Sequence, residues 1–114
     1  NVKAQRWSVK EFELNCYNLT KLLIQNSMTH VDYMSVDVQG GELAALKTID
    51  FSLVQIDVIG VEQMTMNVRA QKPGSQTVET FLTEQGYAKM GRIDDDDFFI
   101  RKDKSTGKPV LSFE

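Results

Sequence analysis

The chain has 114 residues, 41% of them hydrophobic and 25% charged, and a formal net charge of -3 at pH 7. This composition is typical of one soluble globular domain, so we expect a single domain over residues 1–114 with residues 103–114 as an exposed tail. The small negative charge and the lack of an apolar run long enough to cross a bilayer argue against nucleic acid and membranes as partners.

The first predicted elements are a helix and a strand. Asn15 or Asn18 can cap the helix, which has apolar residues at helical spacing and is expected to end near Asn26. The next stretch, "VDYMSVDV" (Val31–Val38), is rich in β-branched and aromatic residues. It predicts a buried strand.

The middle of the chain repeats this order. The stretch "GGELAALKTI" predicts a short helix, and "VQIDVIGVE" (Val54–Glu62) predicts a second buried strand. A loop follows up to "KPGS", where Ser75 can cap a third helix that stops at Gly86. The stretches "YAKMGRI" and "FFIRK" then flank the acidic turn "DDDD" (Asp94–Asp97) and predict an antiparallel hairpin.

The predicted order of elements is helix, strand, helix, strand, helix, strand, strand. Strands joined through helices pair in parallel by right-handed crossovers, and the hairpin closes the sheet, so the fold class is α/β. Ligands in such sheets bind beyond the carboxyl ends of the parallel strands. Asp37 and Glu62 fall at these ends and are the first candidate functional residues.

The stretch "SVDVQGGE" places a glycine pair after Asp37. Gly40 and Gly41 allow a sharp turn and the close approach of a ligand, while Glu42 favours the positive end of the following helix. Asp37 would then point into the crevice. The pattern is equally compatible with Asp37 as a helix cap and glycines that only serve the turn.

The stretch "VDYMSVDVQGGELAALKTIDFSLVQIDVIGVE" is similar to the core of the FkbM family of S-adenosylmethionine-dependent methyltransferases. The stretches "FLTEQGY" and "DDFFIRK" also resemble that family, so the resemblance runs from about Leu14 to Lys102. It implies a Rossmann-like sheet of seven strands. This chain would supply the fourth to seventh strands, with the last antiparallel, as the carboxyl-terminal half of a class I methyltransferase domain.

The chain departs from the family pattern in three ways. Gln39 stands where the family usually has glutamate, and Gly41 stands where the family usually has alanine. If the glutamate assists the chemistry or binds a metal in the family, Gln39 would weaken that role here. No glycine-rich cofactor loop precedes Asn15. We therefore expect S-adenosylmethionine to be the cofactor of the complete protein. The isolated chain is expected to bind no cofactor and to be inactive, and no metal site is expected.

The resemblance implies methyl transfer to oxygen of a small-molecule or glycan acceptor. A hydroxyl acceptor needs a base, and Asp37 is the first candidate for that base or for an acceptor or metal contact, with Glu62 second. The remaining candidates, for substrate contact or for the turn, are Gln39, Gly40, Gly41 and Glu42. The alternative function is a non-catalytic Rossmann-like interaction module that keeps the fold. A glycine-rich turn upstream in the parent protein would favour the enzyme.

In the family's strand order, Val31–Val38 would lie at a free sheet edge without the first three strands. Such an edge exposes unpaired backbone groups, so we expect a homo-oligomer through this strand or pairing with the missing amino-terminal half.

Four further features are given structural explanations. His30 has no second histidine or cysteine to complete a metal set, so a surface or capping role is expected. Asp94–Asp97 lacks the spacing of a calcium loop and predicts a solvated turn. "NLT" (Asn18–Thr20) matches a glycosylation site but is expected to cap a helix. Cys16 is the single cysteine, so no intrachain disulfide can form, and this suits a reducing, cytoplasmic compartment. Cys16 is expected to be a packing residue.

Overall fold

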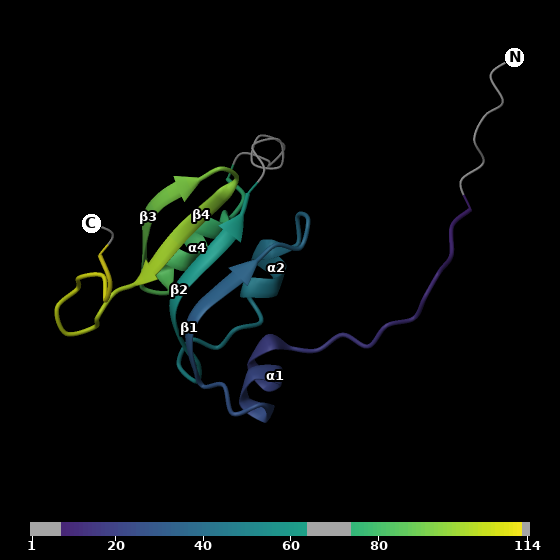
Figure 1. The fold of residues 1–114 in the computed structure, drawn as a ribbon, viewed down its shortest axis with the longest axis horizontal. Coiled ribbons are helices and arrows are strands. Elements are labelled where there is room, and N and C mark those ends of the chain that lie inside the picture. Colours follow the sequence, from purple (N-terminus) through teal and green to yellow (C-terminus); the bar gives the residue numbers. More distant parts are fainter. Residues whose placement is uncertain (1–7, 64–73, 113–114) are drawn as a thin grey trace, which may run out of the picture.

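Helices and strands alternate along the computed structural model, which describes residues 8–63 and 74–112. In chain order they are α1 (Leu19–Gln25), β1 (His30–Val36), α2 (Glu42–Leu46), β2 (Gln55–Glu62), α4 (Val78–Glu84), β3 (Tyr87–Ile93) and β4 (Asp96–Arg101), as Figure 1 shows. This is the order predicted from the sequence. The loop predicted after Glu62 falls largely on residues 64–73, outside the described residues.

The described strands form one sheet in the order β1-β2-β4-β3. β1 pairs in parallel with β2, while β4 lies antiparallel to both of its neighbours, β2 and β3. The predicted α/β class, with a parallel pair and a carboxyl-terminal antiparallel hairpin, is therefore confirmed. The register pairs Val36 with Val61 and Glu62 with Asp96, which brings three chain segments together at one edge of the sheet.

The core lies between the sheet and the helices α2 and α4, which contact each other and lie on the same side of the sheet in Figure 1. Leu46 of α2 and Leu82 of α4 are fully buried against Ile59 and Phe99 of the two central strands. Tyr87 is also buried, and its hydroxyl donates a hydrogen bond to the Ile56 carbonyl. Desolvation by this burial raises the pKa of Tyr87, so the hydroxyl stays protonated.

Side-chain caps fix the ends of the helices. Asn18 caps α1 as predicted, because its side chain accepts a hydrogen bond from the Lys21 amide at 3.2 Å. The predicted cap of α4 is wrong by two residues. Thr77, not Ser75, is the N-cap, because its hydroxyl and that of Thr80 each accept the other residue's amide hydrogen in a capping box.

The predictions for Cys16 and for the first strand need correction. Cys16 is exposed rather than packed, because residues 8–17 run away from the sheet as an extended arm (Figure 1). β1 ends at Val36, and its middle is not buried: Tyr33 is 52% exposed. The physical reason is that β1 is an edge strand, so it has a neighbouring strand on one side within the described residues.

Beyond β4 the chain folds back on itself. The Asp103 amide donates to the Lys108 carbonyl at 2.8 Å, and the Val110 amide donates to the Arg101 carbonyl at 2.9 Å. Residues 104–108 are exposed at the tip of this turn.

None of the helices in the described residues is long and apolar enough to cross a bilayer.

We expect copies of the chain to associate through the edge of β1 that has no partner strand in residues 8–63 and 74–112, because unpaired strand edges are templates for pairing. Tyr33→Lys should lower the association constant by about tenfold or more. In a contact between two copies, the new lysine would either face the same lysine of the other copy or lose its water against an apolar surface. Sedimentation at several concentrations measures this. The control is Thr83→Lys, which adds the same charge at an exposed position of α4. A strictly monomeric wild type, or equal effects of both variants, would contradict the edge contact.

Candidate acidic site at the carboxyl edge of the sheet

Asp37 and Glu62 lie next to each other at the carboxyl ends of β1 and β2. Because Val36 and Val61 are paired in the parallel register, the residue that follows each of them emerges at the same edge. Asp37 is exposed, whereas Glu62 is partly buried at the end of β2. The structure thus brings together the two carboxylates that were singled out from the sequence.

The ionisation of Glu62 is strongly perturbed. A hydrogen bond with Asp37, burial and the negative charges of Asp37, Asp96 and Asp95 raise the pKa of Glu62 to about 7. One of its oxygens, Oε2, is buried and has no hydrogen-bond partner among the described residues. A carboxyl group with a pKa near 7 is present in both its protonated and its ionised form at neutral pH. Glu62 can therefore accept or release a proton under physiological conditions.

The side chain of Gln39, two residues further along the chain, contacts the carboxylate of Asp37. The Gln39 amide nitrogen Nε2 lies 3.3 Å from Asp37 Oδ1 and donates to it. A glutamate at position 39 would instead add another negative charge. Gln39 therefore changes the charge around Asp37 as well as its hydrogen bonding.

Glu42 closes the turn that carries Asp37. Its side chain is buried, with 8% of the residue exposed, and its Oε1 accepts hydrogen bonds from the Val38 amide at 3.3 Å and the Gly40 amide at 3.2 Å. Asp37 does not cap α2, because the N-cap is Gly41 and no side chain bonds to the end of this helix. The capping alternative for Asp37 is therefore wrong.

The two glycines of the turn have different roles. Gly40 has a φ of 97°, which L side chains rarely adopt, whereas Gly41 lies at -94°. We expect Gly40→Ala to lower the free energy of unfolding by about 1–3 kcal/mol through backbone strain, since the added Cβ would meet no atom within 4 Å. Gly41→Ala should change it by less than about 1 kcal/mol, because its Cβ would make an ordinary contact with Val38 at 3.4 Å. Urea unfolding of both variants tests this, and equal losses would contradict the assignment.

The acidic stretch Asp94–Asp97 is only in part the solvated turn that was predicted. Asp94 and Asp95 form the turn, but Asp97 lies in β4 and is 3% exposed. It accepts hydrogen bonds from Arg92 Nη1 at 3.2 Å and from Gln63 Nε2 at 2.8 Å, and Lys89 Nζ lies 3.6 Å away. This correction follows from the hairpin register, which places Arg92 opposite Asp97.

Asp97 and Arg92 also anchor the chain next to Glu62. Arg92 Nη2 donates to the Gln63 carbonyl at 2.7 Å, so the hairpin holds both the backbone and the side chain of the residue that follows Glu62. Sequence reasoning missed this support. The signal available was the spacing of Arg92 and Asp97 on either side of a two-residue turn.

A second cluster of charged side chains lies at the opposite ends of β1 and β2. His30 Nε2 lies 2.9 Å from Asp57 Oδ2 and 3.8 Å from Asp32 Oδ1. These groups are close enough to surround a cation, but Arg101 already pairs with Asp57 at 3.0 Å. Although burial opposes the change, the hydrogen bonds from His30 and Arg101 lower the pKa of Asp57. The cluster combines the ion pair between Arg101 and Asp57 with polar contacts of His30, and it joins β1, β2 and β4.

Comparison with known proteins gives one family match in the part of the chain that carries the acidic site. A family model described as the methyltransferase FkbM domain matches residues 3–89, which is more than half of the chain. The matched range includes Asp37, Gln39 and Glu62 and extends into β3. No curated protein and no solved structure gives a significant match.

Proposed function

The chain belongs to the methyltransferase FkbM family, and from this premise we propose that Asp37 and Glu62 serve proton transfer in an S-adenosylmethionine-dependent methyltransferase. The observation that carries the proposal is the raised pKa of Glu62, about 7, beside Asp37 at the carboxyl edge of two parallel strands. Perturbed carboxyl groups at this edge are typical of sites that bind ligands and transfer protons.

The strand order supports an assignment of the sheet to the carboxyl-terminal half of a Rossmann-like methyltransferase domain. In this assignment β1, β2, β3 and β4 are the fourth, fifth, sixth and seventh strands, and the antiparallel β4 lies between β2 and β3. The free edge of β1 would then adjoin the first strand of a complete domain. Residues 1–114 would form this half as a single unit.

The residues of this chain fit the acceptor better than the cofactor. The edge offers carboxylates at Asp37 and Glu62, and the sequence has no glycine-rich loop of the kind that cradles a nucleotide. S-adenosylmethionine, bound by a complete domain, would supply the methyl group. The isolated chain is expected to bind it weakly or not at all and to be inactive.

Asp37 would act as the base for the acceptor. It is exposed, and the Gln39 side chain positions it by a hydrogen bond, so it can accept the proton of a hydroxyl group as the oxygen becomes methylated. Glu62, with its pKa raised to about 7, would take up this proton from Asp37 and release it to solvent between turnovers. Gly40 and Glu42 would shape the turn, and Gln39 and Gly41 would border the acceptor.

The charge of the edge restricts the acceptor. Asp95 and Asp96 add to the negative field at Glu62, so an anionic acceptor would be repelled. An uncharged hydroxyl compound, such as a sugar unit of a glycan or a neutral small molecule, fits this field. Nucleic acid does not fit it.

The test is a methyl-transfer assay with the protein encoded by the complete reading frame. The protein is incubated with methyl-labelled S-adenosylmethionine and a panel of neutral glycans and hydroxyl compounds, and O-methyl products are identified by mass spectrometry. Label in an acceptor supports the enzyme. Transfer of the methyl group to nitrogen or carbon would overturn O-methylation, but it would still support a methyltransferase.

The alternative function is a non-catalytic interaction module. It is favoured by Gln39, which stands where the family usually has glutamate, and by the free edge of β1. A complete protein that binds no S-adenosylmethionine and transfers no methyl group, but associates through β1, would identify the module.

A further inference from the structure

The residue that follows Glu62 is held by the hairpin through both its backbone and its side chain. The Gln63 amide donates to the Asp95 carbonyl at 2.7 Å, and the Gln63 carbonyl accepts from Arg92 Nη2 at 2.7 Å. The side-chain nitrogen Nε2 of Gln63 donates to Asp97 Oδ2 at 2.8 Å. These partners all belong to β3, β4 and the turn between them, so the hairpin fixes the chain at the point where β2 ends.

Arg92 is the centre of this support. Besides its bond to Gln63, its guanidinium donates through Nε to the Asp94 carbonyl at 3.1 Å and through Nη1 to Asp97 Oδ1 at 3.2 Å. One side chain thus joins the turn of the hairpin, a buried carboxylate and the end of β2. A planar guanidinium can make these bonds together, whereas a lysine ammonium on its flexible stem cannot.

The burial of Asp97 keeps this support in place. Asp97 is 3% exposed, and Lys89 Nζ lies 3.6 Å from its Oδ1 and 3.6 Å from Glu79 Oε2 on α4. A buried carboxylate that lost its partners would be strongly destabilising, so the folded chain retains Arg92 beside it. The support therefore connects the end of β2 to the helix layer.

The support acts on Glu62 through the backbone. In the register of β2 and β4, Val61 is opposite Asp97 and Glu62 is opposite Asp96. Side chains of consecutive residues in a strand point to opposite faces of the sheet. Arg92 accordingly bonds to Gln63 and Asp97, while the carboxyl group of Glu62 belongs to the other face.

We propose that Arg92 is a positioning residue of the acidic site, which holds the carboxyl group of Glu62 beside Asp37 by fixing Gln63. The inference rests on the proposed function for the role of Glu62 in proton transfer. Without Arg92, the end of β2 would be free to shift, and Glu62 would lose its contact with Asp37 for part of the time.

The ionisation of Glu62 reports its position. The hydrogen bond with Asp37 is the main cause that raises the pKa of Glu62 to about 7, so a displaced Glu62 should have a pKa closer to 4.5. The loss of a positive charge alone would have the opposite effect. Arg92 Nη2 lies 3.7 Å from Asp95 Oδ1, and the negative charge of Asp95 raises the pKa of Glu62. The two explanations thus predict changes of opposite sign.

The experiment is a pH titration of the side-chain carboxyl ¹³C shifts in the labelled full chain, followed by NMR. Arg92→Gln should lower the pKa of Glu62 by about one pH unit or more. Arg92→Lys keeps the charge but not the set of bonds, so it should give at least about half of this fall. Gln63→Ala removes only the side-chain bond to Asp97 and should give a smaller fall. An unchanged pKa in all three variants, or a rise in Arg92→Gln that is absent in Arg92→Lys, would overturn the proposal.

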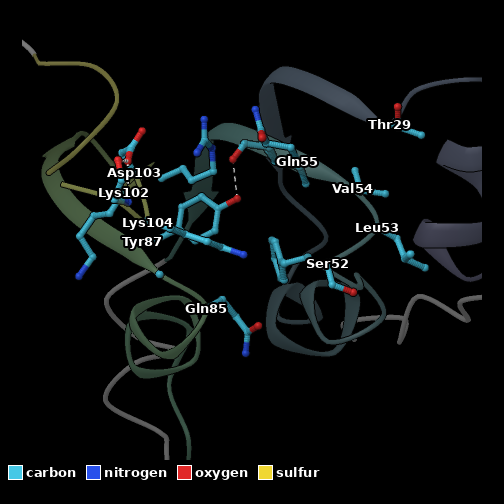
Figure 2. Close-up of a pocket in the computed structure, with 15 residues that line it drawn as sticks. Thr29, Ser52, Leu53, Val54, Gln55, Gln85, Tyr87, Lys102, Asp103 and Lys104 are labelled. Carbon is cyan, nitrogen blue, oxygen red and sulfur yellow. Dashed lines mark hydrogen bonds between the residues drawn. The ribbon is translucent and has the colours of Figure 1, made fainter. Parts of the chain in front are cut away.

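Two controls separate position from charge and from stability. Lys104→Gln removes an exposed positive charge at the cavity that Figure 2 shows, whose lining residues come from the start of β2, the start of β3 and the end of β4, away from the acidic edge. Thr77→Ala removes the capping box of α4 and lowers the stability of the fold. Both should leave the pKa of Glu62 within about 0.3 of the wild-type value. A fall in Thr77→Ala as large as that in Arg92→Gln would overturn the proposal.

Methyl transfer by the complete protein is the second readout. Arg92→Lys should lower kcat by about tenfold, with KM for S-adenosylmethionine unchanged, and should move the pH profile of kcat in the same direction as the pKa of Glu62. The titration needs neither cofactor nor acceptor. A lowered pKa in a protein that transfers no methyl group would therefore support the positioning and reject methyl transfer, whereas an unchanged pKa in an active enzyme would overturn the positioning alone.

Discussion

Asp37→Asn is expected to lower methyl transfer by the complete enzyme by about 10²–10⁴-fold, the range that a positioned general base contributes. Asparagine keeps the size of the side chain and its contact with Gln39, but it cannot accept the acceptor's proton. Both kcat and kcat/KM should fall by about the same factor, because the lost interaction forms only in the transition state. Single-turnover assays with labelled cofactor measure this.

The control is Asp32→Asn, which makes the same chemical change on β1, near the end of that strand away from the acidic edge. Asp32 has a side chain that is 96% exposed, so its replacement should leave turnover within about twofold. The stability of both variants should match or exceed that of the wild type, because Asp37→Asn removes a negative charge beside Glu62. Unchanged turnover in Asp37→Asn, with normal folding, would show that Asp37 is structural.

The stability of the folded chain is expected to fall as the pH rises towards neutral, and Glu62→Gln should remove much of this fall. Glu62 has its pKa raised from 4.5 to about 7 in the folded chain, chiefly by its hydrogen bond with Asp37. The folded state therefore binds this proton more tightly than the unfolded state does. The stabilisation is fully present below pH 4.5 and is lost as the pH rises through 7.

Urea unfolding at pH 5, 6, 7 and 8 measures the effect. The wild type should lose stability across this window, whereas Glu62→Gln should show a flatter profile and exceed the wild type at pH 8. Glu84→Gln is the control, since Glu84 is exposed on α4 and far along the chain from the acidic edge. Parallel profiles for wild type and Glu62→Gln would mean that Glu62 titrates normally.

The order of elements and the position of the acidic pair could be predicted because both depend on local patterns. The period of the apolar residues distinguishes strands from helices, and parallel strands end at the same edge, so Asp37 and Glu62 had to be near each other. The caps were less certain. Ser75 and Thr77 are both good cap residues, and the contact with Thr80 decided between them.

The chemistry of the site depends on contacts between distant parts of the chain, which a single sequence does not reveal. The pKa of Glu62 includes the charge of Asp96, which lies opposite it only because β4 inserts beside β2. The burial of Asp97 likewise needs Gln63 from the end of β2. The exposure of Tyr33 follows from the strand order and not from the composition of β1.

The insertion of β4 between β2 and β3 also determines when the sheet can be completed during synthesis. β4 is the last strand in the chain, yet among the described strands it is the one that connects β3 to the rest of the sheet. While the ribosome is still making Asp96–Arg101, β2 exposes the side where Val58–Glu62 later pair, and β3 has no strand beside it. The nascent chain therefore holds an apolar strand edge open until Asp96–Arg101 emerge. A chaperone that covers extended apolar segments would have its main role in this interval.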